Sequence, residues 1–143
     1  MSRLPDPSTL VASAVFTGAG TLHFARPDFF ESIVPRWFPS APLANYGSGA
    51  LEILFGLGLL PQRTRRWSAL GLAALAIAVF PANVDMAIND VEIVPNPDGS
   101  GMTRSEGTAT GVVQIVNWLR LPLQVPLVWW LWREAQAAAT TGD

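Results

Sequence analysis

The sequence contains no cysteine and no lysine, and it has a single histidine and a single tyrosine. Without cysteine the chain can form no disulfide, no thiolate metal site and no cysteine nucleophile. Charge is also scarce, because Asp, Glu, Lys and Arg make up 14% of the residues, and the net charge is −2. The nine basic residues are scattered arginines, so we expect no nucleic-acid partner. One histidine with carboxylates on separate segments gives no metal-ligand spacing, and no metal is expected.

Apolar residues are abundant instead. Half of the residues are hydrophobic and the mean hydropathy is +0.30, which is high for an ordinary soluble domain. Four segments approach the length of about 20 apolar residues that crosses a bilayer, namely residues 8–24, 43–60, 67–88 and 108–132. The sequence therefore predicts an all-α fold, an integral membrane four-helix bundle that forms one membrane domain over residues 1–143.

The basic residues predict an orientation for these spans. Arg63, Arg65 and Arg66 lie between the second and third spans, and such a cluster favours the cytoplasmic side. An even number of spans then places both termini in the cytoplasm, together with Arg3 and Arg133. We expect the first span to be retained, because its flanking charges and following residues do not resemble a cleavable signal peptide.

The two outer connections differ in character. Residues 28–37 place apolar side chains on one side of a short amphipathic element, which is expected on the outer side between the first two helices and broken near Pro35. Residues 89–107 contain the turn-forming run PNPDGSG at 95–101 and predict a mobile polar loop. Asp85, near the end of the third span, is interpreted as solvated.

Arg120 is the single charge within residues 108–132. With Gln114, Asn117 and Gln124 it forms a polar stripe at helical spacing, i, i+3, i+6 and i+10. A guanidinium at this depth is costly in lipid, so the stripe is expected to face a protein interior or a wet cavity.

The second span has a polar stripe of its own. Asn45, Ser48 and Glu52 lie at i, i+3 and i+7, and Gly49 and Gly56 flank Glu52 so that another helix can approach closely. Glu52 and Arg120 lie at similar depth, which predicts that they meet directly or through one polar residue, water or ligand. Such a pair either joins two helices or lines a ligand site, and the two roles are compatible.

Two further polar residues have alternative readings. His23 lies near the outer end of the first span and is either a site residue or an interfacial histidine bonded to a carbonyl. Asn83 is either a site residue or the partner of a carbonyl that Pro81 frees. The candidate catalytic residues are Glu52 and His23. The candidate ligand-binding residues are Arg120, Glu52, Gln124, Asn83, Asn117 and His23.

Several short phrases occur in a familiar order, among them GAGTLHF at 18–24, SGALEI at 48–53, FPAN at 80–83 and RLPLQ at 120–124. Their succession over residues 18–124 resembles the DoxX-like family of small bacterial integral membrane proteins. The resemblance implies a four-helix membrane bundle in the bacterial plasma membrane. It also implies association with quinone-linked oxidation or with membrane oxidoreductase and sulfurtransferase partners. The residues that match the family pattern are His23, Glu52, Asn83, Arg120 and Gln124.

Three functions remain open from these observations. The preferred one is a binding or accessory protein whose polar site holds a small amphipathic molecule, a quinone or another isoprenoid lipid, as a subunit of a membrane oxidoreductase system. The second is a membrane enzyme that performs isomerase-like or quinone-linked acid–base chemistry with Glu52 and His23. The third is a structural subunit of a larger complex, and a homo-oligomer also remains open.

Overall fold

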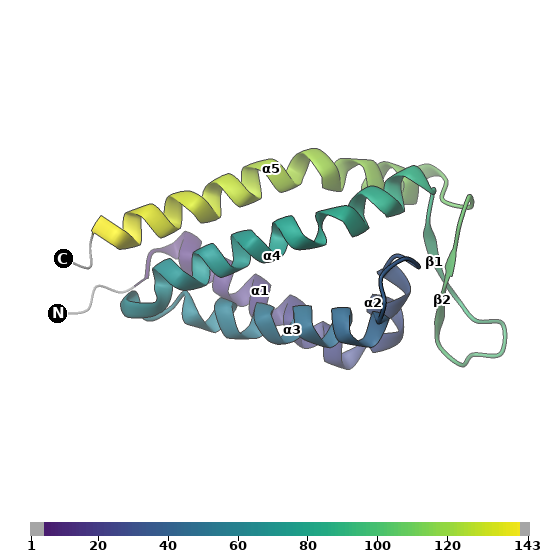
Figure 1. Cartoon of the computed structure of the whole chain (residues 1–143), viewed down its shortest axis with the longest axis horizontal. Helices are drawn as coiled ribbons and strands as arrows, with labels where there is room; N and C mark the ends of the chain where they lie inside the picture. Colours follow the sequence, from purple (N-terminus) through teal and green to yellow (C-terminus); the bar gives the residue numbers. More distant parts are fainter. Residues whose placement is uncertain (1–4, 141–143) are drawn as a thin grey trace.

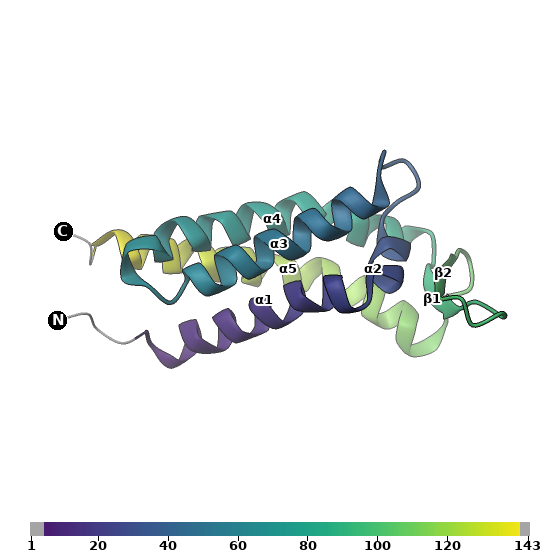
Figure 2. The same cartoon turned by 90° about the horizontal axis from the view of Figure 1, so that it is seen from below.

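The computed structural model describes residues 5–140. Along the chain the elements are α1 (Pro7–Ala25), α2 (Pro27–Ile33), α3 (Ala41–Gly58), α4 (Gln62–Ile88), β1 (Glu92–Pro95), β2 (Met102–Ser105) and α5 (Gly111–Thr140). The four long helices pack as two pairs, α1 with α3 and α4 with α5, and α3 also contacts α4 (Figure 1). The shorter α2 and the two-stranded hairpin lie together at one end of the molecule (Figure 2).

The predicted fold class, an all-α integral membrane four-helix bundle, is wrong. Residues 5–140 form five helices and a two-stranded antiparallel sheet, and α4 is the one helix in this range that is long and apolar enough to cross a membrane. The polar residues on the other long helices explain this difference. α1 carries serines, threonines and His23, α3 carries Asn45 and Glu52, and α5 carries Arg120 with its neighbouring amides, so their apolar runs are interrupted.

Local sequence signals set where several helices begin and end. The Asp6 carboxylate caps α1 by accepting hydrogen bonds from the Ser8 hydroxyl at 2.6 Å and the Thr9 amide at 3.0 Å. These bonds, the Ser8 hydroxyl foremost, hold the pKa of Asp6 below its ordinary value. Ser40 caps α3 through the Leu43 amide at 3.3 Å. The predicted break near Pro35 is confirmed, because α2 ends at Ile33, just before the residue that precedes this proline.

The expected loop at 89–107 contains regular structure. Glu92 pairs with Ser105 and Pro95 with Met102, and the turn between them is closed by the Asn96 amide, which donates to Gly101 O at 2.8 Å. Asp85 is correspondingly not solvated, because it forms an ion pair with Arg104 of β2 in which the side chains are 14% and 7% exposed. Strands of four residues are too short to show an alternating pattern, so the sequence did not reveal the hairpin or its partner.

The tightest part of the hydrophobic core lies at the end opposite the hairpin. Leu59, which directly follows α3, Leu72 of α4 and Leu131 of α5 are almost fully buried there. Thr9 Oγ1 donates to Glu134 Oε2 at 3.2 Å, which joins α1 to α5. Towards α2 and the hairpin the two helix pairs separate (Figure 1), and a cavity lies in this half of the molecule.

Candidate functional site

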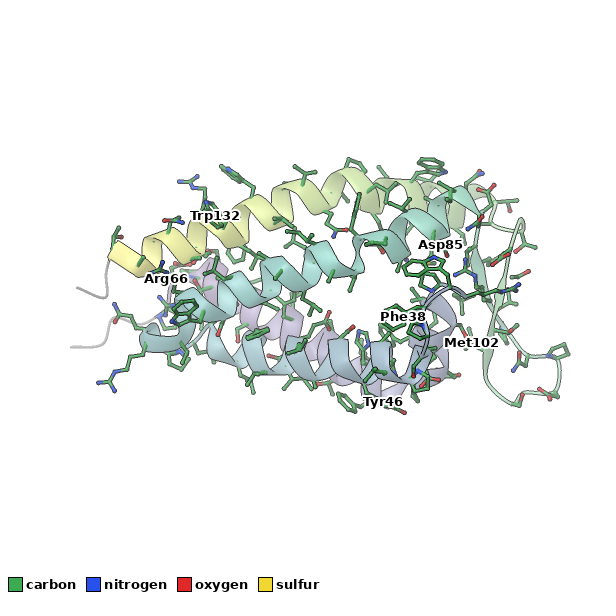
Figure 3. All side chains as sticks on the ribbon, viewed as in Figure 1. Phe38, Tyr46, Arg66, Asp85, Met102 and Trp132 are labelled. Carbon is green, nitrogen blue, oxygen red and sulfur yellow. The ribbon has the colours of Figure 1, made fainter. Side chains whose placement is uncertain are left out.

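A cavity of about 530 Å³ lies between the segment 30–38, the N-terminal half of α3, the C-terminal half of α4 and Arg120 of α5. Phe38 and Asp85, labelled in Figure 3, mark this half of the molecule, whereas Arg66 and Trp132 lie towards the other end. The size is within the range of about 300–1,000 Å³ that is typical of small-molecule sites. The apolar wall includes Phe30, Ile33, Val34, Trp37, Phe38, Leu75 and Val79.

The polar wall of the same cavity comes from all four long helices. His23 of α1, Glu52 of α3 and Arg120 of α5 all line it, with Asn83 of α4. A smaller chamber of about 270 Å³ adjoins it and shares Glu52, Asn83 and Arg120. The structure therefore gathers four of the six predicted ligand-binding residues around one cavity, and a fifth, Gln124, lines the smaller chamber.

His23 and Glu52 are direct neighbours. His23 Nε2 lies 3.6 Å from Glu52 Oε2, and the two side chains are 13% and 20% exposed. The other ring nitrogen, Nδ1, lies 2.8 Å from Asn45 Oδ1, and the Asn45 amide donates to the His23 carbonyl at 3.2 Å. Asn45 appeared in the sequence as part of a stripe, but its role as the partner of His23 depends on how α1 meets α3.

Three glycines allow α1 and α3 to pack closely against each other. A Cβ atom placed on Gly49 would lie 2.5 Å from the His23 Cβ, and one on Gly20 would lie 2.6 Å from the Gly49 carbonyl oxygen. Gly56 is equally crowded, since a Cβ there would lie 2.7 Å from Thr17 Oγ1. The prediction that Gly49 and Gly56 allow a helix to approach is therefore confirmed, and that helix is α1.

Arg120 has no carboxylate within 4.0 Å in the described part of the chain. Its Nη1 lies 3.4 Å from the sulfur of Met86, which is a weak acceptor. The direct form of the predicted Glu52–Arg120 pair is thus absent between these two residues, although both line the same cavity. Their connection through a ligand, water or polar residue stays a prediction.

Gln124 links α5 to α4. Its Nε2 donates to the Ala76 carbonyl, and its Oε1 accepts from Asn83 Nδ2 at 2.9 Å. Ala76 lies one residue before Ile77, whose carbonyl is the one that Pro81 leaves without a helical donor. Asn83 had been considered as the direct partner of that freed carbonyl; here its amide donates to Gln124 instead.

The rest of the α5 stripe lies nearer the hairpin. Asn117 is 2% exposed and donates to the backbone carbonyls of Val91 at 2.8 Å and Met86 at 3.4 Å. Gln114 Nε2 donates to Asp90 Oδ1 at 2.9 Å. Neither Gln114 nor Asn117 lines the two chambers. The polar stripe of α5 therefore has two parts. Gln114 and Asn117 bind the connection to the hairpin, whereas Arg120 and Gln124 line the chambers.

The side chains that sequence reasoning missed are the aromatic ones. Phe30 stacks on His23 with ring centroids 3.9 Å apart and 26° between the planes. Phe30 belongs to the amphipathic segment that was expected on the outer side between the first two helices, and the apolar periodicity of this segment was the signal that it covers something. Trp37 and Phe38, in the connection to α3, complete this side of the cavity.

Fold and site together define a class: a helical protein with a largely apolar cavity whose polar wall carries a guanidinium, a carboxylate and an imidazole. The family model of the Domain of unknown function (DUF8561) matches residues 12–135, and the chain belongs to this family. No curated protein and no solved structure matches the chain.

Proposed function

We propose that this protein is a membrane protein that binds a small amphipathic molecule, with the polar head of the ligand at Arg120 and its apolar part against the aromatic wall. The observation that carries the proposal is the state of Arg120. Its guanidinium is half-buried at a mostly apolar cavity, with a methionine sulfur as its one hydrogen-bond partner among residues 5–140.

An unpaired guanidinium in such surroundings favours a particular ligand chemistry. Its donors are left without strong acceptors, and a charge removed from water is costly unless it is paired. A ligand carbonyl or anionic group would supply these acceptors, because a guanidinium donates several hydrogen bonds in a fixed plane.

The neighbouring residues have separate roles in this proposal. Glu52 and His23 lie across the same cavity and offer acid–base groups to the head of the ligand. Asn83 and Gln124 are engaged with each other and with Ala76, so they act mainly by shaping the wall. Asn117 is engaged in the same way, because its amide donates to two backbone carbonyls.

Membrane placement rests on α4 and on what the long helices expose. Residues 67–84 of α4 contain no charge, and Ile77 is 60% exposed. Apolar side chains are also exposed on the other long helices, for example Leu54 at 62% and Val125 at 70%. A surface of this kind suits lipid rather than water.

The finer placement is a multi-pass position in a bacterial plasma membrane with both termini in the cytoplasm. Arg63, Arg65 and Arg66 lie at the start of α4, at the same end of the molecule as the first turn of α1 and the last turns of α5 (Figure 1). The positive-inside rule places this end in the cytoplasm. Arg3, which was counted with them, lies outside the described residues.

The resemblance to DoxX-like proteins extends the proposal to ligand and partner. A quinone or another isoprenoid lipid has both a carbonyl-bearing head and an apolar tail, and it matches the division of the cavity into a polar and an aromatic wall. A role as a subunit of a membrane oxidoreductase system follows from the same resemblance.

Native mass spectrometry of gently purified protein, combined with extraction of bound molecules, tests the proposal. The wild type is expected to retain an amphipathic molecule, and Arg120→Gln is expected to lose about 90% or more of it, since one charged hydrogen bond contributes about 1.5–3 kcal/mol. Arg63→Gln is the matched control, because Arg63 is exposed at the far end of α4. Equal retention in Arg120→Gln and wild type would contradict the proposed site.

A further inference from the structure

The single histidine of the chain is held on three sides. Asn45 lies at Nδ1, Glu52 lies at Nε2, and the Phe30 ring stacks on the face of the imidazole. These three residues fix both the plane of the ring and the direction of each nitrogen. The two ring nitrogens are therefore in different chemical surroundings, and those surroundings determine where the proton of the neutral imidazole lies.

The Asn45 amide can take one orientation. One of its polar atoms is 3.2 Å from the His23 carbonyl oxygen, and a carbonyl can accept but not donate, so this atom must be the NH₂ group. The amide oxygen then faces His23 Nδ1 at 2.8 Å and requires a donor. Asn45 is 2% exposed, where an unsatisfied oxygen would be costly. His23 Nδ1 therefore carries a proton.

This assignment decides what Nε2 can do. In the neutral imidazole Nε2 has a lone pair, and it faces Glu52 Oε2, a buried oxygen that has no hydrogen-bond partner. A lone pair and a carboxylate oxygen repel, so the stable arrangements hold one proton between them. The proton lies either on Glu52, beside a neutral ring, or on Nε2, beside a carboxylate. Their separation of 3.6 Å is longer than a hydrogen bond, and a small shift of either side chain brings them into contact.

We propose that His23 and Glu52 form a proton-exchanging pair at the cavity wall, and that Asn45 is the positioning residue that fixes the tautomer of His23. The exchange moves one proton between Glu52 Oε2 and His23 Nε2 or the head group of the ligand, and no electron is transferred. Arg120 is the other charged group that lines this cavity, and it stabilises a head group that has given up its proton.

The His23–Glu52 pair narrows the class of ligand that the cavity would bind. This part of the inference rests on the proposed function. The head should carry an exchangeable proton next to an apolar tail, as a phenol or a carboxylic acid does; among quinone-type ligands this selects the reduced quinol form. The tautomer of His23 depends on contacts within the protein alone, so it can be tested without any ligand.

The tautomer can be read directly by ¹⁵N NMR of histidine-labelled protein in detergent, because one histidine gives one pair of ring signals. In the neutral form Nδ1 is expected to be protonated and Nε2 unprotonated. Asn45→Leu should shift the population towards the Nε2-protonated tautomer. Asn117→Leu should not, because Asn117 is equally buried but bonds the carbonyls of Met86 and Val91 and not the ring. A wild-type ring protonated mainly at Nε2 overturns the inference, and this spectrum does not depend on how any variant folds.

The ligand half is tested with 4-octylphenol and its methyl ether, 4-octylanisole, as probes. The wild type is expected to bind the phenol about tenfold more tightly, and Glu52→Gln should lose most of that preference. A preference that persists in Glu52→Gln overturns the proton-exchanging pair alone. Failure of the wild type to bind either probe overturns the inferred ligand class. The proposed function would still stand if the wild type retains a copurified molecule that Arg120→Gln loses.

Discussion

Both polar atoms of the Gln124 side-chain amide form hydrogen bonds, and these bonds join α5 to α4 near Pro81. Its oxygen accepts from Asn83 and its nitrogen donates to the Ala76 carbonyl. Arg120, one turn earlier on the same helix, has no comparable partner. Two polar residues of the same stripe thus differ: Gln124 forms hydrogen bonds within the fold, whereas Arg120 has donors that the proposed ligand would use.

Gln124→Leu should lower the free energy of unfolding by about 1–3 kcal/mol, because it leaves the Ala76 carbonyl and the Asn83 amide without these partners at nearly constant side-chain volume. Thermal unfolding in detergent, followed by circular dichroism, measures the change. Val125→Leu, at a neighbouring position that is 70% exposed, serves as the control and should change little. An unaltered midpoint for Gln124→Leu would mean that solvent or lipid satisfies both groups.

The backbones of α1 and α3 approach each other closely at glycines, and this contact assembles His23, Asn45 and Glu52. Gly49 lies at its centre. Gly49→Ala should therefore destabilise the protein by about 1–3 kcal/mol through overpacking, even though alanine is the better helix former. The same variant should disturb the ¹⁵N signals of His23.

Gly47→Ala provides the matched comparison within α3. A Cβ atom there meets nothing within 4 Å, so the substitution should stabilise the protein by about 0.5–1 kcal/mol. Chemical denaturation of both variants in the same detergent compares them. Equal effects of the two substitutions would show that the α1–α3 contact is looser than described.

Sequence reasoning located the long helical segments but not everything that joins them. Periodicity and apolar length predicted helices close to α1, α3, α4 and α5, because such signals extend over many residues. The hairpin and the Asp85–Arg104 pair were missed, because they depend on a four-residue strand reaching back to the end of α4. At the site, the polar side chains were identified, whereas the pairing of His23 with Asn45 and Glu52 required the packing of α1 on α3.

The whole molecule has two unlike ends, and the orientation proposed for it in a membrane can be measured. Because the sequence has no cysteine, Thr64→Cys in the first turn of α4 and Ser100→Cys in the hairpin turn can each be labelled without prior substitution. An impermeant thiol reagent applied to intact cells should reach Ser100→Cys and not Thr64→Cys. The reverse pattern would show that the arginine cluster faces outward, and labelling of both would contradict a membrane barrier between them.

The proposed function requires that the cavity beside Arg120 holds a molecule. A crystal structure of the protein from a lipidic mesophase, without added ligand, tests it most directly. We expect density that begins within hydrogen-bond distance of the Arg120 guanidinium and continues along Phe30, Trp37 and Phe38. A closed, dry cavity in which Glu52 and Arg120 contact each other directly would contradict the claim and favour a purely structural role.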